Sequence, residues 1–381
     1  MELLNEHQRL RFKLGRSLAR DEQTAVNEFR QAIWQPDMTT VIFFCSSRYN
    51  LDIMGKELAK YFDCPLIGCT TAGEISSAGY QEGGIVGASL ASNELKLHRQ
   101  VISPLSRFSL VTAEKAASAI RGKLSIARGF NKKNMFGLVL IDGLSLREEA
   151  TLASLYTCFE GISVIGGSSG DDLEFKKTWI YDDGRFISDA AVFSVFETTL
   201  PFMTFKTQHF QPTENKIVIT GADPKCRIIT EINGEPAARE YARIIGLEQK
   251  ELNPSVFSDN PLLLRIGGDW HVRAIQKLNT DGSLSIFSAI EEGLVLTIGR
   301  GVDMISNFEK QMALLEKSVP PNRFYIMCDC ILRKLELQNR GNIEEINRLL
   351  AYRNVIGFST YGEQFNSIHV NQTLTGIVIG G

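Results

Sequence analysis

One short pattern occurs three times along the chain, and it constrains the fold more than any other feature of the sequence. It reads Ile-Gly-x-(Ser/Thr)-(Ser/Thr)-x-x-(Asp/Glu), and its copies begin at Ile67, Ile165 and Ile356. An apolar run rich in β-forming residues starts about 30 residues before each copy, a period typical of repeated structural units. The chain is therefore predicted to contain one structural unit in three diverged copies.

Each repeat unit is predicted to be a strand, a helix and a second strand that ends at the Gly-Ser/Thr turn. The segments between the strands carry apolar residues at helical spacing, namely Leu51, Met54, Leu58 and Phe62, then Leu152, Leu155 and Phe159, then Ile343, Ile346 and Leu350. Because a helix connects them, the two strands should be parallel and form a right-handed crossover. After the motifs we expect hairpin-like strand pairs, residues 83–90 with 95–102 and 178–186 with 190–196, and a last strand segment at 369–380.

The whole pattern predicts a mixed α/β fold in which parallel pairs are combined with antiparallel hairpins. We expect an N-terminal helical segment over residues 1–36, a domain over residues 37–205 with two repeat units, and a domain over residues 206–381 with a mixed sheet and the third unit. Asp21 is the expected N-cap of a helix that ends near residue 33. The basic residues before it are predicted to form a solvated helix face, with contact to an acidic partner as the alternative: Arg9, Arg11, Lys13, Arg16 and Arg20.

Composition and charge restrict the classes to which this protein can belong. The 381 residues are 44% hydrophobic and 22% charged, which is typical of packed globular proteins. A net charge of −3 provides no general field for nucleic acid or an anionic membrane. No segment approaches the roughly 18 apolar residues of a membrane span, and charges interrupt the region where a signal peptide would be apolar. The seven cysteines are scattered through apolar segments, as free thiols are in a reducing compartment. We therefore expect a cytoplasmic protein.

The repeated turns should lie at the carboxyl ends of parallel strands, where α/β sheets bind ligands. The alternative is that glycine and the hydroxyl residues only form tight turns, with Glu74, Asp172 and Glu363 capping nearby backbone. Nucleotide-binding, zinc-protease and hydrolase signatures are absent, so we expect no enzyme. Ser168 beside Asp171 is the one acid/base pair to consider for a hydrolase.

Three histidines are candidate cofactor ligands. His209 lies in a non-repetitive segment between the predicted domains, flanked by Phe205 and Phe210, and an imidazole among aromatic residues is typical of an axial haem ligand. His271 and His369 lie on predicted C-terminal strands and could line the same cleft. The alternative for His209 is a ring that fixes the linker by hydrogen bonding to backbone, and for His271 and His369 it is a satisfied core or rim residue.

Several separated blocks resemble the FIST family of cytoplasmic sensory proteins. They are IGCTTAGEI, VIGGSSGDD with AAVFSVF, EINGEPAAREY, and GFSTYGEQ followed by HVNQTLTG, and the resemblance extends from about residue 24 to the end. It implies an N-terminal and a C-terminal FIST domain, a small ligand, and a signalling partner instead of catalysis.

The segments QHFQPTENKIVIT and WHVRAIQKL, with DGSLSIFSAIEEGLVLT, are similar to one branch of that family, the nitric-oxide-sensing haem proteins of the NosP type. This similarity implies haem as cofactor, nitric oxide as signal, and a histidine kinase or a cyclic-di-GMP enzyme as partner. It favours His209 as the metal ligand over His369, because His369 belongs to the general closing motif. His271 and His369 remain further cofactor-binding candidates. A sensor of another small molecule such as an amino acid, a hydrolase using Ser168 and Asp171, and a homodimer remain the alternatives.

Overall fold

The three predicted strand–helix–strand units are present, and each contains a parallel strand pair. The computed structural model describes residues 9–124 and 132–381 and has a mixed α/β fold. The parallel pairs are β2 (Thr40–Ser46) with β3 (Leu66–Thr71), β8 (Met135–Ile141) with β9 (Ser163–Ser168), and β22 (Phe324–Cys330) with β23 (Asn354–Thr360). Their connecting helices are α2 (Leu51–Tyr61), α4 (Glu148–Cys158), and the pair α8 (Ile331–Asn339) and α9 (Ile343–Ala351). The prediction of parallel strands is confirmed for all three copies.

Each parallel pair lies within a six-stranded sheet, and the three sheets have the same order of elements. The first is β1 (Arg11–Ser17), β6 (Ile85–Ala91), β2, β3, β10 (Ile180–Asp182) and β11 (Arg185–Ile187). The second is β7 (Leu95–Ile102), β12 (Ala191–Thr198), β8, β9, β24 (Glu363–Phe365) and β25 (Ile368–Val370). The third is β13 (Phe202–Thr207), β26 (Leu374–Ile379), β22, β23, β4 (Glu74–Ser76) and β5 (Gly79–Gln81).

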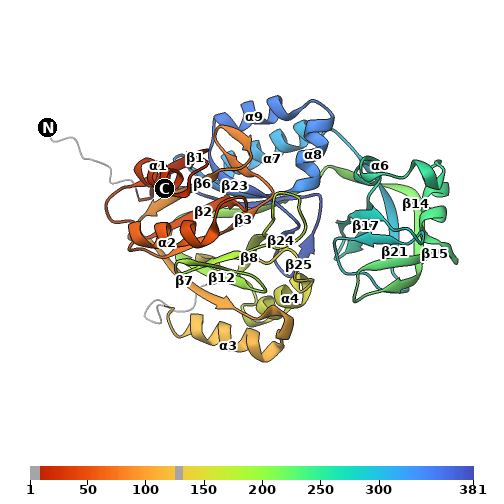
Figure 1. The fold of residues 1–381 in the computed structure, drawn as a ribbon, viewed down its shortest axis with the longest axis horizontal. Coiled ribbons are helices and arrows are strands. Elements are labelled where there is room, and N and C mark those ends of the chain that lie inside the picture. Colours follow the sequence, from red (N-terminus) through yellow and green to blue (C-terminus); the bar gives the residue numbers. More distant parts are fainter. Residues whose placement is uncertain (1–8, 125–131) are drawn as a thin grey trace.

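The hairpin that follows each motif completes the sheet of another unit. The hairpin β4–β5 of the first unit pairs with β23, β10–β11 of the second pairs with β3, and β24–β25 of the third pairs with β9. The exchange is cyclic, so the third unit is joined to the first two by backbone hydrogen bonds. The body is thus one structure made by three units (Figure 1).

Two predictions about local structure were wrong. Residues 83–90 and 95–102 do not pair with each other, because β6 already has β1 and β2 on its two edges, and β7 instead pairs with β12. In the same way β12 pairs with β7 and β8, while residues 178–186 lie largely in the hairpin β10–β11.

The basic segment before residue 20 is a strand, β1, and not a helix face. Phe12 and Leu14 alternate with more exposed residues and pack against the body core, which is the two-residue period of a strand. The helix that follows is as expected: α1 (Glu22–Ile33) begins at Asp21, whose carboxylate accepts a hydrogen bond from the Thr24 amide at 2.8 Å.

A shared apolar core lies between the three sheets, and helices cover their outer faces. The isoleucines of the three motifs, Ile67, Ile165 and Ile356, all belong to this central core. Phe44 of the first sheet stacks on Phe358 of the third with ring centroids 4.5 Å apart. The outer helix pairs are α1 with α2, α3 (Leu110–Arg121) with α4, and α7 (Met304–Ser318) with α9. None of the helices in the described residues is long and apolar enough to cross a membrane.

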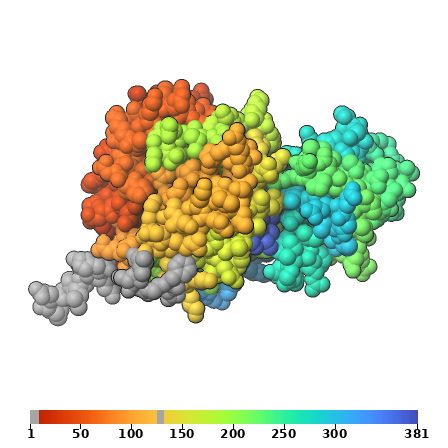
Figure 2. All heavy atoms as spheres, turned by 90° about the horizontal axis from the view of Figure 1, so that it is seen from below, coloured from red at the N-terminus to blue at the C-terminus, as the bar shows by residue number. Residues whose placement is uncertain are grey.

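Residues 210–301 form a lobe that projects from the body (Figure 1, Figure 2). All its strand pairs are antiparallel, in the order β18 (Asp269–Arg273), β17 (Leu262–Ile266), β21 (Val295–Gly301), β14 (Phe210–Asp223), β15 (Ile228–Ile232), β20 (Leu284–Ile286) and β19 (Ile275–Leu278), with β16 (Glu235–Pro236) beside β15. Helices α5 (Ala237–Ile244) and α6 (Pro254–Asp259) complete its separate core. The chain enters the lobe after β13 and leaves it before α7, so two passages join lobe and body.

The glycine of the motif allows close approach of the parallel neighbour. Gly68, Gly166 and Gly357 are paired in register with Phe43, Val139 and Met327. A Cβ atom on Gly166 would lie 1.9 Å from the Val139 carbonyl oxygen, and one on Gly357 would lie 2.2 Å from that of Met327. On Gly68 it would meet the Phe43 ring at 2.4 Å. The outer side chain of one strand therefore covers the glycine of the next.

We expect Gly166→Ala and Gly357→Ala each to lower the free energy of unfolding by about 1–3 kcal/mol or more, because the backbone must move to admit the methyl group. The matched control is Gly122→Ala, at a helical backbone position where the added Cβ has its closest contact at 3.4 Å. Urea unfolding followed by circular dichroism measures the difference. Equal stability of the three variants would contradict the proposed role of the motif glycine.

Candidate functional site

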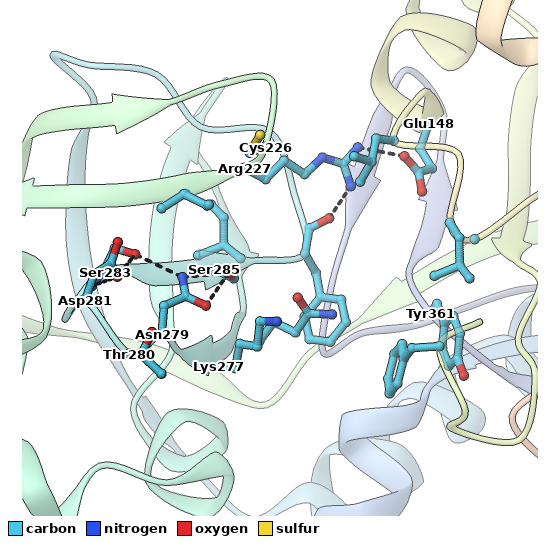
Figure 3. A pocket seen from close by; sticks show the side chains of 18 residues that line it. Glu148, Cys226, Arg227, Lys277, Asn279, Thr280, Asp281, Ser283, Ser285 and Tyr361 are labelled. Atoms are coloured by element: carbon cyan, nitrogen blue, oxygen red, sulfur yellow. Dashed lines mark hydrogen bonds and ion pairs between the residues drawn. The ribbon is translucent and has the colours of Figure 1, made fainter. Parts of the chain in front are cut away.

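A cavity of about 510 Å³ lies where the lobe meets the body (Figure 3). The body contributes the loop after β8, the start of α4, Phe175 after β9, and Tyr361 after β23. The lobe contributes β15, β19, β20 and the turn between the last two. The cavity thus adjoins the carboxyl ends of three strands from two parallel pairs, where the sequence analysis placed a ligand site.

The acidic residue of each motif caps nearby backbone, as the structural alternative predicted. Glu74 accepts from the Gly84 amide at 3.2 Å, Asp172 from the Ser47 amide at 3.0 Å, and Glu363 from the Thr373 amide at 3.1 Å. Burial raises the pKa of both Glu74 and Glu363 to about 8, so these side chains carry a proton through much of the neutral range. These three carboxyl groups have a structural role in the folded protein.

The turn of the second copy differs because its other acidic residue, Asp171, fixes a loop on the cavity wall. Asp171 accepts from the amides of Phe175, Lys176 and Lys177 at 2.9, 2.6 and 2.9 Å. The Tyr361 hydroxyl donates to Asp171 at 2.5 Å and accepts from the Leu173 amide at 3.0 Å. A residue of the third unit therefore holds a loop of the second.

Several bulky residues on the body wall have left-handed backbone conformations. The φ angle is 55° at Leu146 and 51° at Phe175, which line the cavity, and 68° at Leu173, which lies in the same loop as Phe175 outside the lining. Such conformations cost about 1–3 kcal/mol each in residues with a side chain, and they concentrate at functional sites. The surrounding hydrogen bonds maintain the strained loop after β9.

The lobe wall is polar and carries two charges without an ionic partner. Asn279 donates to the hydroxyls of Ser283 and Ser285 at 2.9 and 3.0 Å, and Asp281 accepts from the Ser283 amide at 3.0 Å. Within the described residues Lys277 forms no ion pair or hydrogen bond, and Asp281 is bonded only to neutral donors. The wall therefore offers one free cation and one unneutralised carboxylate.

Arg227 bridges the two walls. It extends from the lobe to the body, where it forms an ion pair of 2.6 Å with Glu148 (Figure 3) and another of 2.6 Å with Glu149. It also donates to the Phe287 carbonyl within the lobe. Arg227 and Glu148 are buried, so this contact is part of the attachment of the lobe to the body.

His209 lies near the passage into the lobe and away from the cavity lining. Its Nδ1 is 3.1 Å from a guanidinium nitrogen of Arg333, which can only donate, so Nδ1 accepts. Its Nε2 therefore carries the proton and donates to the Glu336 carboxylate at 3.0 Å. Burial lowers the pKa of His209, in keeping with a neutral ring.

These contacts leave His209 without a free lone pair, which an axial haem ligand requires. The residues around His209 therefore do not fit haem ligation in this conformation. The ring is hydrogen-bonded within the protein, although to the side chains of Arg333 and Glu336 and not to backbone as the alternative expected.

The other two candidate histidines also lie outside the cavity lining. His271 on β18 has Nδ1 3.5 Å from the Lys206 amine, and burial lowers its pKa to about 4. His369 on β25 has Nδ1 2.9 Å from the Gln364 amide oxygen, while its buried Nε2 has no hydrogen-bond partner among the described residues. His369 is buried, and a Cβ atom added to Gly362 would lie only 2.7 Å from that nitrogen. His209 is bonded to α8, whereas His271 and His369 lie on β18 and β25, which contact each other.

Ser168 and Asp171 do not form an acid/base pair. The Ser168 hydroxyl accepts from Gln364 at 2.8 Å, and Asp171 is occupied by the amides and the tyrosine described above. Cys328 and Cys330 are buried free thiols, and the described residues contain no group of three or more His, Cys, Asp or Glu side chains suited to a metal. His7 lies outside the described residues.

The sequence analysis did not identify the residues that line the cavity. Tyr361 is a variable position of the third motif copy, whereas Arg227, Lys277 and Asp281 carry no local signal of function. They come from segments far apart in the chain and meet only because the lobe lies against the body. The left-handed conformation of Phe175 has no sequence signal, since that conformation favours glycine or asparagine.

Comparisons with known proteins agree with the fold and with the resemblance found in the sequence. The sequence model of a family described as FIST N domain matches residues 39–235, and that of a FIST C domain matches residues 237–366. An uncharacterized protein from Methanocaldococcus jannaschii is 27% identical over 185 residues, which are 47% of this chain and 35% of the relative. The chain thus spans about a third of the length of that relative.

We expect Arg227→Met to lower the free energy of unfolding by roughly 3–5 kcal/mol, because Glu148 is left buried without its cation. Adding Glu148→Gln should restore part of the loss. The matched control is Arg239→Met, whose exposed guanidinium lies 4.0 Å from Glu235 and should contribute less than about 1 kcal/mol. Urea titrations of wild type, of the two single variants and of the double variant measure these changes in the free energy of unfolding. Equal losses for Arg227→Met and Arg239→Met would contradict a bridging role.

Proposed function

Because the chain belongs to the FIST family, whose domains are sensory domains of signal transduction, we propose that it binds a small ligand in the cavity between lobe and body. The observation that carries this proposal is the position of the cavity. Its walls belong to two structures with separate cores, joined by two chain passages. A ligand that contacts both walls stabilises the arrangement in which they are close, and this is how binding energy changes a conformational equilibrium.

The charges of the lobe wall favour a zwitterionic ligand, such as an amino acid. Lys277 can bind a carboxylate and Asp281 can bind an ammonium group. The hydroxyls of Ser283 and Ser285, which accept hydrogen bonds from Asn279, also line the cavity. A cavity of about 510 Å³ is within the range of small-molecule sites. Since both charges lack an ionic partner in the described residues, a ligand does not have to break an ion pair to reach them.

The output of this sensor is proposed to be a change in a partner protein. A histidine kinase or a cyclic-di-GMP enzyme is the partner class that the sequence resemblance implies. Regulation requires the partner to distinguish two positions of the lobe, with a coupling free energy of typically 1–3 kcal/mol. The lobe projects from the body, so its displacement changes a large part of the molecular surface (Figure 2).

We expect calorimetric titration with a panel of amino acids to detect binding to the full chain. Lys277→Gln and Asp281→Asn should each weaken that binding by about tenfold or more, because each removes a hydrogen bond to a charged group worth roughly 1.5–3 kcal/mol. Lys317→Gln on α7 is the matched control, since this exposed lysine lies outside the cavity lining. If the panel shows no binding, the zwitterion proposal fails; if all variants bind like wild type, the cavity is not the site.

Haem binding with nitric-oxide sensing is the other function that the sequence resemblance implies, and the contacts of His209 do not favour it. We expect His209→Ala to lower stability, because Arg333 and Glu336 lose a buried partner. After incubation with haem, it should show the same Soret absorption as wild type, with and without nitric oxide.

The controls for this experiment are His271→Ala and His369→Ala, measured in the same way. A Soret band that wild type and both controls show but His209→Ala lacks would contradict this expectation. It would return His209 to the role of metal ligand.

A further inference from the structure

The cavity is amphipathic, because its two walls differ in chemistry. The lobe wall carries the polar and charged groups described above, among them Lys277 and Asp281. The body wall is largely apolar and includes Leu144, Leu146 and Phe175. A zwitterionic head group held by the lobe would therefore direct the rest of the ligand toward this apolar wall.

Phe175 is the most unusual residue of the apolar wall. Its ring stacks on Tyr361 with centroids 4.5 Å apart and an interplanar angle of 15°, yet the residue is 40% exposed. Stacking covers one face of the ring, and the exposed remainder lines the cavity. A large aromatic side chain is thus presented to the space where a ligand would lie.

Two unfavourable contributions to the free energy act on Phe175 in its observed position, and specific contacts offset them. Partial exposure forfeits part of the free energy that burial of a phenylalanine provides, and the left-handed backbone at φ 51° is strained. The opposing constraints are the bond from the Phe175 amide to Asp171 and the stack on Tyr361, whose hydroxyl is itself bonded to Asp171. The ring is therefore preorganised, which reduces the entropy lost when a ligand stacks on it.

From these observations we infer that the ligand is a zwitterion with a planar aromatic side chain, which stacks on the free face of Phe175. The inference rests on the proposed function and assigns Phe175 as the residue that determines specificity. Aromatic pairs prefer stacked or edge-to-face geometry and gain more than buried area alone provides. A branched aliphatic side chain of similar size fills the same space without that gain.

The test compares L-phenylalanine, L-leucine and L-alanine by calorimetric titration of the full chain. In wild type, phenylalanine should bind about tenfold more tightly than leucine, and alanine most weakly. Phe175→Leu retains apolar volume but removes the aromatic face, so phenylalanine and leucine should then bind with similar affinity. Tyr352→Leu, at an aromatic residue of the body that is 88% exposed, is the matched control and should keep the wild-type preference.

Two results would overturn the inference while leaving the proposed function intact. One is equal affinity of wild type for the three amino acids, and the other is a preference for phenylalanine that persists in Phe175→Leu. Absence of binding by all three in wild type, together with absence across the wider panel, would overturn both. Circular dichroism of Phe175→Leu shows whether the variant keeps its fold.

Discussion

The hydrogen bonding of sheet edges is the constraint on which the rest of this structure depends. A strand at the edge of a sheet leaves unpaired backbone groups that must be satisfied. In the body, the edge formed by the second parallel strand of each unit is covered by a hairpin from another unit, and the three exchanges form a cycle. No unit completes its own sheet. The first and last parts of the chain must therefore meet before the body is complete, and the third unit packs with the first two although the lobe separates them in sequence.

This cycle also brings the three motifs together around one core. The motif isoleucines point inward, the glycines lie under the outer side chains of their parallel neighbours, and the acidic residues cap nearby backbone. Three equivalent positions thus serve one structural purpose. The second unit departs from this equivalence, because Asp171 fixes a strained loop there and the lobe lies against it.

The lobe provides the second wall of the cavity, which the three repeat units of the body do not form by themselves. Its attachment includes polar contacts, with Arg227 on Glu148 and Glu149 and, at another point, Arg340 on Asp259. It also includes apolar packing, because Leu332 of α8 lies against the lobe cluster that contains Phe210 and Leu263. The bonds of His209 to Arg333 and Glu336 lie near the chain passage. These bonds join the segment that leads into the lobe to helix α8 of the body.

The sequence by itself determined the repeated unit, the parallel strand pairs, the helices between them except α8, and the family. These features depend on local periodicity and on a motif whose residues are close together, so they can be recognised without knowledge of the fold. Strand partners beyond the parallel pairs could not be predicted, because β7 and the exchanged hairpins pair according to which edges are free. The interpretation of residues 9–20 as a helix face was wrong because charges hid the alternation of Phe12 and Leu14. The candidate site was decided only by the tertiary structure. Phe175, Arg227 and Tyr361 have their contacts with neighbours that are distant in sequence, and the same holds for His209, whose two ring nitrogens are bonded to Arg333 and Glu336.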